Sequence, residues 1–233
     1  MNPLTRLWRS IFRLRLPSTD EDERQAYVRR SVFLHLHPPT IAREALKLKH
    51  SFCLGGLSFL LFIVSVLTGV ILMFYYSPTT AGAHSSITDI DNVVAFGQFI
   101  RALHRYASEL MLITVFFHMI RVALHGAYKT PREFNWSVGV ILLLLLLLTA
   151  FTGYLLPFDG LSYEAVSVAK GMADSASPVG IWINKLLFGG DKIGDAALLR
   201  TYVLHCIALP LTMFLLMTFH FWRVRRDGFK GGM

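Results

Sequence analysis

The sequence predicts an all-α, polytopic membrane protein built as a bundle of four transmembrane helices. Of its 233 residues, 54% are hydrophobic and only 16% are charged, and the mean hydropathy is +0.49. Soluble domains typically carry about 25% charged residues. Three runs contain no Asp, Glu, Lys or Arg, namely residues 51–83, 134–158 and 201–222. Each run exceeds the ~20 residues that a spanning helix needs, and residues 101–121 supply a fourth, largely apolar stretch.

The four spans are predicted at residues 52–76, 103–124, 136–156 and 202–222, within one domain that covers residues 51–228. Residues 1–50 precede this domain as an extension, and residues 229–233 follow it as a tail. In residues 1–16, apolar side chains alternate with arginines at helical spacing. This pattern predicts an amphipathic helix that lies on the inner leaflet or packs on a partner subunit. Residues 159–199 are too long for a simple turn and contain helix-like pieces at 162–172 and 178–188.

Basic residues flank the spans and do not form a separate soluble face, which argues against nucleic acid as a partner despite the net charge of +8. They precede the first span and follow the second and the fourth; the last group is Arg223, Arg225, Arg226 and Lys230. With four spans, these groups share one side. The positive-inside rule makes that side cytoplasmic, stromal or matrix-like, so both termini are predicted inside.

Two histidines stand on each of two predicted spans. His104 and His118 lie fourteen residues apart in the second span. At 1.5 Å per residue they are separated by about 21 Å along the axis, and fourteen steps of about 100° return them to nearly one face. His205 and His220 lie fifteen residues apart in the fourth span. That interval overshoots four turns by about 60°, and a kink at Pro210 could re-aim one imidazole.

The first and third spans carry glycine pairs with the same interval as His104 and His118. Gly55 and Gly69 are fourteen residues apart, as are Gly139 and Gly153. A glycine in a membrane helix usually admits a neighbouring helix. Two glycine pairs that share the interval of the histidine pair favour two flat macrocycles, one above the other in the membrane, that lie against the glycine faces of these helices.

Depth in the membrane pairs the histidines. The second and fourth spans run in the same direction, so His104 pairs with His205 near the outer surface and His118 with His220 near the inner surface. Ligation by two histidines saturates an iron axially, which suits electron transfer. Two alternatives remain open. One is a dihaem cytochrome b that anchors a dehydrogenase or hydrogenase, and the other is a haem-free transporter that uses the histidines as proton relays.

Several motifs in these spans resemble the cytochrome b subunits of quinol-oxidising bc and b6f complexes, and specifically the short, split b6 type. The motifs are FCLGG (52–56), FYYSPT (74–79), IRALHRY (100–106), FHMIRV (117–122), GAYKTPREFNW (126–136), TGYLLPFD (152–159) and RTYVLH (200–205). The resemblance covers roughly residues 38–228. The fifteen-residue histidine interval is itself typical of the b6 type.

The resemblance implies specific roles for individual residues. His104 and His205 would hold the low-potential haem b, and His118 and His220 the high-potential haem b. Arg101 and Arg200 match arginines near the outer haem, where a guanidinium pairs with a propionate. Cys53 matches the cysteine that attaches an additional c-type haem beside the inner haem b, and Arg225 matches a residue near that haem. Cys206 has no such match and is interpreted as packing.

The resemblance also implies partners and a reaction. The chain would transfer electrons from quinol oxidised outside to quinone reduced inside, coupled to proton translocation, in a dimeric complex of an energy-transducing bacterial or thylakoid membrane. Residues 159–199 would form one wall of the quinol pocket, beside a Rieske iron–sulfur protein. The other wall carries a Pro-Glu-Trp-Tyr motif that this sequence lacks, so a second subunit would supply it. A c-type cytochrome or plastocyanin would accept the electrons.

Two positions depart from the family pattern. Phe158 stands where a tryptophan is usual, which is a conservative aromatic change. Glu109 stands where a small or apolar residue is expected, four residues after Arg105. This spacing predicts a partly desolvated ion pair within the second span, with a proton-relay role as the alternative.

Overall fold

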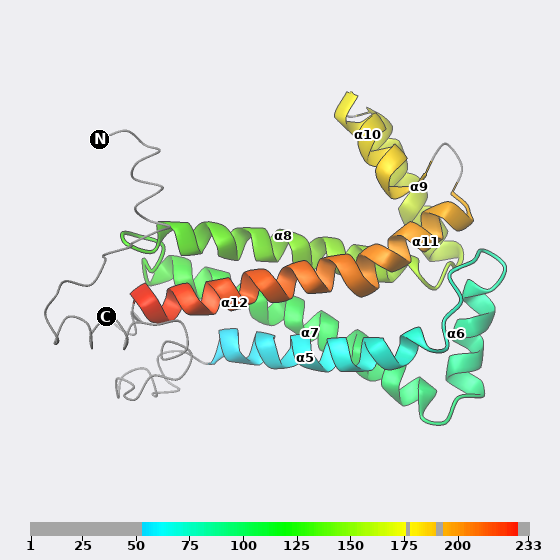
Figure 1. The fold of residues 1–233 in the computed structure, drawn as a ribbon, viewed down its shortest axis with the longest axis horizontal. Helices are drawn as coiled ribbons and strands as arrows, with labels where there is room; N and C mark the ends of the chain where they lie inside the picture. The colour runs from blue at the N-terminus through cyan, green and yellow to red at the C-terminus, as the bar shows by residue number, and fades with distance from the viewer. Residues whose placement is uncertain (1–52, 176–177, 190–192, 228–233) are drawn as a thin grey trace, which may run out of the picture. The chain divides into compact units, whose positions relative to one another are not determined.

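The structure, a computed structural model, describes residues 53–175, 178–189 and 193–227, which contain helices and no strand. In chain order, labelled as in Figure 1, the helices are α5 (Leu54–Met73), α6 (Ala83–Asn92), α7 (Gly97–Leu124), α8 (Glu133–Leu155), α9 (Gly160–Ser175), α10 (Pro178–Leu187), α11 (Asp195–Val203), the π-helical turn η2 (Leu204–Ala208) and α12 (Leu209–Asp227). The predicted extension over residues 1–50 and the tail over residues 229–233 lie outside the described residues.

The prediction of four spanning helices is confirmed. Four helical stretches are long and apolar enough to cross a membrane, namely Leu54–Met73, Gly97–Leu124, Glu133–Leu155 and Asp195–Asp227. The second and fourth stretches begin six or seven residues before the predicted spans, and the fourth also ends five residues later. Hydropathy marks only the apolar part of a helix, whereas the backbone hydrogen-bond ladder continues through charged ends such as Asp195 and Asp227.

The helices divide into two compact units. Of the described residues, the first consists of 53–55, 114–143 and 214–227; the second consists of those within 56–113 and 144–213. Each unit contains one histidine from α7 and one from the last spanning stretch. We refer to them as the His118 unit and the His104 unit and describe each by itself.

The last spanning helix contains a π turn at Leu204–Ala208, and this turn includes His205. A π turn holds one residue more than an α turn. One absorbed residue removes about 100° from the helical phase and turns an overshoot of about 60° into a shortfall of about 40°. The fourteen-residue interval in α7 has the same shortfall. The π turn, rather than a proline kink alone, therefore reconciles the fifteen-residue interval with the fourteen-residue one.

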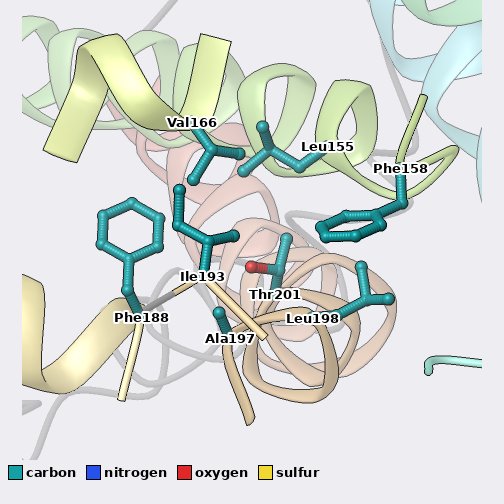
Figure 2. A pocket seen from close by; sticks show the side chains of 8 residues that line it. All are labelled: Leu155, Phe158, Val166, Phe188, Ile193, Ala197, Leu198 and Thr201. Carbon is teal, nitrogen blue, oxygen red and sulfur yellow. The ribbon is translucent and has the colours of Figure 1, made fainter. Parts of the chain in front are cut away.

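Between α8 and the last spanning helix, α9, α10 and α11 pack around a small apolar core in the His104 unit. Leu155, Val166, Phe188 and Ala197 are each only 3% exposed. Figure 2 shows these side chains converging with Phe158, Ile193, Leu198 and Thr201. The space left among them is about 10 Å³, so the core is filled and holds α9 and α10 against the end of α8. The two loop helices coincide with the helix-like pieces expected from the sequence.

A polar contact joins α9 to α10. Lys170 Nζ lies 3.0 Å from Asp174 Oδ2, and the Asn184 amide donates to Asp174 Oδ1 and to the Lys170 carbonyl. The hydrogen bond from Lys170 lowers the pKa of the Asp174 carboxyl. The connection between the two helices is therefore defined by side chains as well as by the apolar core.

The segment after α5 is fixed by three hydrogen bonds to distant residues. The Tyr76 hydroxyl donates to the Leu156 carbonyl at 2.6 Å, and its ring stacks on Tyr202 with centroids 5.5 Å apart. Burial raises the pKa of Tyr76, so the hydroxyl keeps its proton and remains a donor. The Thr80 amide and hydroxyl both donate to Asp195 Oδ1, at 2.7 and 2.6 Å. These bonds tie the segment to the end of α8 and the start of α11.

Candidate functional site

In the His104 unit, α7 and the π turn bring the imidazole rings of His104 and His205 close together. Their ring centroids are 6.1 Å apart and the ring planes meet at 75°. Metal–imidazole bonds are about 2 Å long, and each ring nitrogen lies roughly 1 Å from its centroid, so two imidazoles on one metal have centroids about 6 Å apart. The observed separation fits two axial ligands of a single ion. The structure thus brings together the histidines that were paired by depth.

Both imidazoles are oriented through Nδ1. His104 Nδ1 lies 3.0 Å from the Ser65 carbonyl on α5, and His205 Nδ1 lies 2.9 Å from the Thr149 carbonyl on α8. A carbonyl oxygen can only accept, so Nδ1 carries the proton in each bond. This tautomer leaves the Nε2 lone pair available to a metal. A ligating histidine characteristically donates its other N–H in this way.

A five-residue pattern supplies these contacts, and sequence reasoning missed it. Residues 65–69 read SVLTG and residues 149–153 read TAFTG. In each copy the first residue offers its carbonyl to the imidazole, and the fourth places a threonine hydroxyl near the same nitrogen: Thr68 at 3.0 Å from His104 and Thr152 at 3.4 Å from His205. The glycine ends the pattern. The repeat was visible in the sequence as Ser/Thr-x-x-Thr-Gly, which begins four residues before Gly69 and before Gly153.

Gly69 and Gly153 allow the imidazoles to lie against the helix backbones. A Cβ added at Gly69 would lie 3.0 Å from His104 Cε1, and one at Gly153 would lie 2.5 Å from His205 Cε1. The second distance is shorter than any normal carbon–carbon contact, so a side chain at position 153 would displace the ring. Gly69 and Gly153 are therefore a requirement of histidine placement and not only of helix packing.

In the His118 unit, as in the His104 unit, a glycine lies beside each histidine. A Cβ at Gly55 would meet His118 Cε1 at 3.3 Å, and a Cβ at Gly139 would meet His220 Cε1 at 3.6 Å. His118 and His220 lie within electrostatic range of each other. The fourteen-residue glycine interval thus corresponds to contacts: each of the four glycines faces one of the four histidines.

Cys53 and Arg225 also belong to the His118 unit. The Cys53 thiol is exposed, and the residue lies immediately before α5, two positions ahead of the glycine that backs His118. Its backbone has φ = +50°, an uncommon conformation for a residue with a side chain. Arg225 is exposed in the last turn of α12, five residues after His220.

The two arginines expected near the outer haem have protein partners in the structure. Arg101 Nε donates to Asp91 Oδ1 on α6 at 2.7 Å, and its Nη2 donates to the other carboxylate oxygen. Arg200 Nη1 donates to the Lys185 carbonyl at 2.5 Å. Asp91 was not anticipated, because α6 has a polar sequence that a search for apolar spans does not detect.

Arg121 is a further residue that sequence reasoning missed. Among the residues that the structure describes, its buried Nε and Nη2 atoms have no hydrogen-bond partner, and it stands three residues after His118. Buried guanidinium N–H groups require an acceptor, so this position suits an anionic group beside His118. The sequence did contain a signal for this role, because Arg121 follows His118 by three residues just as Arg101 precedes His104 by three.

Two sequence expectations require correction. Arg105 and Glu109 do form an ion pair, with Nε and Oε1 2.9 Å apart, but their side chains are 72% and 51% exposed and are not desolvated within this chain. Arg223 is not a surface cation that flanks the fourth span. Its side chain is 0% exposed and lies 3.1 Å from the Asp227 carboxylate, because α12 continues one turn beyond the apolar stretch.

Within the described ranges, no group of three or more His, Cys, Asp and Glu side chains could hold a metal ion. Histidines come in pairs instead. A pair suits a metal whose other ligands belong to a macrocycle. The close glycine backbones, the fixed Nδ1 protons and the centroid separation all fit haem.

Comparison with known proteins agrees with this geometry. The family described as cytochrome b/b6/petB matches residues 42–228. Cytochrome b6 of Heliomicrobium gestii is 44% identical over 182 residues, which cover 78% of this chain and 85% of that protein. Cytochrome b6 of Desmonostoc sp. is 40% identical over 180 residues, with 77% and 84% covered.

A solved structure is also similar. A chain of a hyperthermophilic respiratory Complex III superposes with a TM-score of 0.75 at 28% identity, covering 92% of this chain and 56% of that one. This chain therefore spans little more than half the length of that relative. From the family match and the relatives together, the chain belongs to the cytochrome b/b6 family and is a membrane cytochrome that binds b-type haem.

Proposed function

We propose that this chain carries electrons across the membrane, from quinol oxidised on the outer side to quinone reduced on the inner side, as the haem-bearing subunit of a Rieske/cytochrome b complex. The observation that carries the proposal is the opposed pair His104 and His205, with each Nδ1 bound to a helix carbonyl. Two axial imidazoles leave no open coordination position. Such a site favours electron transfer over oxygen chemistry.

The four histidines would hold two haems b. His104 and His205 serve the low-potential outer haem, and His118 and His220 the high-potential inner haem. When bound, these groups supply one-electron redox chemistry. The chain orients the imidazoles through Ser65 and Thr149 and provides glycine backbones for close approach.

Arginines would bind the haem propionates. Arg101 and Arg200 are proposed for the outer haem, where Asp91 and the Lys185 carbonyl hold their guanidiniums. Arg121 is proposed for the inner haem, because its buried N–H groups need an acceptor. Arg225 would lie near the additional haem. Each of these side chains acts by charge and by donated hydrogen bonds.

Further features of the domain and of the assembly remain proposals. The dihaem domain covers residues 51–228, and both termini lie on the inner side. α9 and α10 form one wall of the quinol pocket, beside a Rieske protein. A separate subunit brings the Pro-Glu-Trp-Tyr motif, and a c-type cytochrome or plastocyanin-like protein accepts electrons. The complex is dimeric and couples the reaction to proton translocation.

The dithionite-reduced minus oxidised absorption spectrum of the purified protein tests the proposal. We expect the α-band of low-spin b haem, with two b haems per chain, because each histidine pair fills both axial positions of one iron. Absence of that band would leave the transporter hypothesis. Two b haems in a preparation that co-purifies with a dehydrogenase or hydrogenase, and with no Rieske protein, would favour the membrane-anchor hypothesis.

Cys53 is proposed to hold a c-type haem by one thioether bond. Its thiol would add across a haem vinyl group, with the thiol proton passing to the vinyl carbon, so no oxidant is needed. The exposed thiol beside the His118 unit supports this assignment. The assignment is also supported by the FCLGG motif, which resembles the motif that carries the haem-attaching cysteine in b6-type chains.

Denaturing electrophoresis with peroxidase staining provides the test for Cys53. The native protein should give a haem-stained band near 26.3 kDa, and Cys53→Ser should remove it completely, because haem held without a covalent bond is lost on denaturation. Cys206→Ser is the matched control and should keep the band. A native protein without a stained band would refute covalent attachment.

A further inference from the structure

An open apolar groove lies in the His118 unit, where α7 ends and α8 begins. Ile120, Ala123, Leu124, Tyr128 and Trp136 line it, and its volume is about 500 Å³. Nothing in the haem assignment uses these residues. The size of the groove and its apolar walls suit a hydrocarbon chain rather than a polar solute.

The walls of the groove face outward from the unit. Leu124 is 78% exposed and Ile120 is 39% exposed, although both lie on a helix apolar enough to span the membrane. Tyr128 and Trp136 pack together with ring centroids 5.9 Å apart. Tyrosine and tryptophan at the end of a spanning helix are typical of the headgroup level of a bilayer. The groove therefore opens toward lipid at the boundary between acyl chains and headgroups.

Positive charge lies at the headgroup end of the groove. Lys129 is exposed, and its Nζ lies 6.0 Å from the centroid of the Tyr128 ring. Of the residues that the structure describes, no carboxylate lies within ion-pair distance of Lys129. Arg132 donates to the Asp227 carbonyl at 3.3 Å. Glu133, an exposed carboxylate, accepts a hydrogen bond from the Thr130 hydroxyl. With Lys129 and Arg132 against this one carboxylate, residues 129–133 carry a net charge of +1.

We propose that this groove binds one anionic phospholipid. An acyl chain lies along Ile120, Leu124 and Trp136, and the phosphate lies at Lys129. We infer an anionic headgroup from charge complementarity, because a basic residue beside an apolar groove at the membrane surface favours an acidic headgroup over a zwitterionic one. The proposal depends on the spanning helices alone and is independent of the haems and of quinol chemistry.

Native mass spectrometry of the purified full-length protein in detergent tests the site, with phosphatidylglycerol and phosphatidylcholine of identical acyl chains as probes. We expect phosphatidylglycerol to be retained in preference. Lys129→Gln should lower its affinity about fivefold and leave phosphatidylcholine unchanged, since one lysine near a membrane surface contributes on that order. Leu124→Trp, which fills the groove, should lower the affinity for both lipids.

Lys185→Gln is the matched control. It removes an exposed lysine from α10, outside the groove, and should leave both affinities unchanged. Equal retention of the two lipids, or equal effects of Lys129→Gln and Lys185→Gln, would overturn the proposal. So would displacement of phosphatidylglycerol by inorganic phosphate at equal concentration, which would indicate a simple anion site, or by a quinone, which would indicate a quinone groove. Far-ultraviolet circular dichroism verifies that each variant is folded.

Discussion

Replacing His118 with alanine should remove one b haem from each chain and leave the other in place. The inner site loses one of its two axial ligands, whereas His104 and His205 keep their ring geometry and their hydrogen bonds to Ser65 and Thr149. The haem b content, measured by pyridine haemochrome, should fall from two per chain to one. The remaining haem should titrate as a single low-potential component.

His125→Ala is the control for this variant. His125 lies one residue after α7, and its Nδ1 lies 2.9 Å from the Arg121 carbonyl, so it belongs to the helix end and to neither haem site. It should retain both haems. The reciprocal variant His104→Ala should lose the low-potential component and keep the other. If His118→Ala keeps both haems, or if it loses the low-potential one, the pairing by unit is wrong.

Replacing Asp227 with asparagine should destabilise the protein by about 3–5 kcal/mol. Asp227 pairs with Arg223 at 3.1 Å, and the two side chains are 1% and 0% exposed. The Arg223 guanidinium also lies 5.6 Å from the centroid of the Phe134 ring. Without the carboxylate, the buried arginine loses the ion-pair partner 3.1 Å away, and loss of one partner is the costly part of breaking a buried pair. Thermal unfolding of the purified protein, followed by circular dichroism, measures the loss.

Two further variants separate the pair from its surroundings. Arg223→Met combined with Asp227→Leu removes both charges and should recover most of the lost stability, because apolar replacements of a buried pair are often neutral or stabilising. Asp174→Asn breaks another i,i+4 pair, the one between Lys170 and Asp174. The carboxylate side chain of Asp174 is 51% exposed. This variant should have only a small effect, because water screens an exposed pair. Equal destabilisation by Asp227→Asn and Asp174→Asn would contradict the argument.

The four spanning helices could be predicted from the sequence because apolar content and the length of a membrane crossing constrain each other tightly. The histidine and glycine intervals were equally accessible, since they depend only on helical periodicity. The contacts between each glycine and one histidine ring show that the shared interval has a steric cause. Periodicity gives the face of a helix on which a residue lies, whereas the histidine partners were selected by their depth in the membrane.

Other features could not be derived from periodicity. The π turn at Leu204–Ala208 depends on backbone hydrogen bonding that no residue pattern specified. Arg223 was interpreted as a flanking cation because its neighbours are basic, whereas its burial depends on packing against Phe134 and Asp227. Arg101 stands three residues before His104, but its carboxylate partner, Asp91, comes from α6, a polar helix that hydropathy does not detect.

The carbonyl contacts of the outer pair have a consequence for assembly. Ser65 and Thr149 hold His104 and His205 by protein groups alone, so the rotation of each ring and the position of its proton are set before any ligand arrives. Side-chain ordering that is completed during folding does not have to be repeated on binding. The site of His104 and His205 is thus preorganised: part of its affinity for haem resides in the folding of α5 and α8, two helices that contribute no ligand atom.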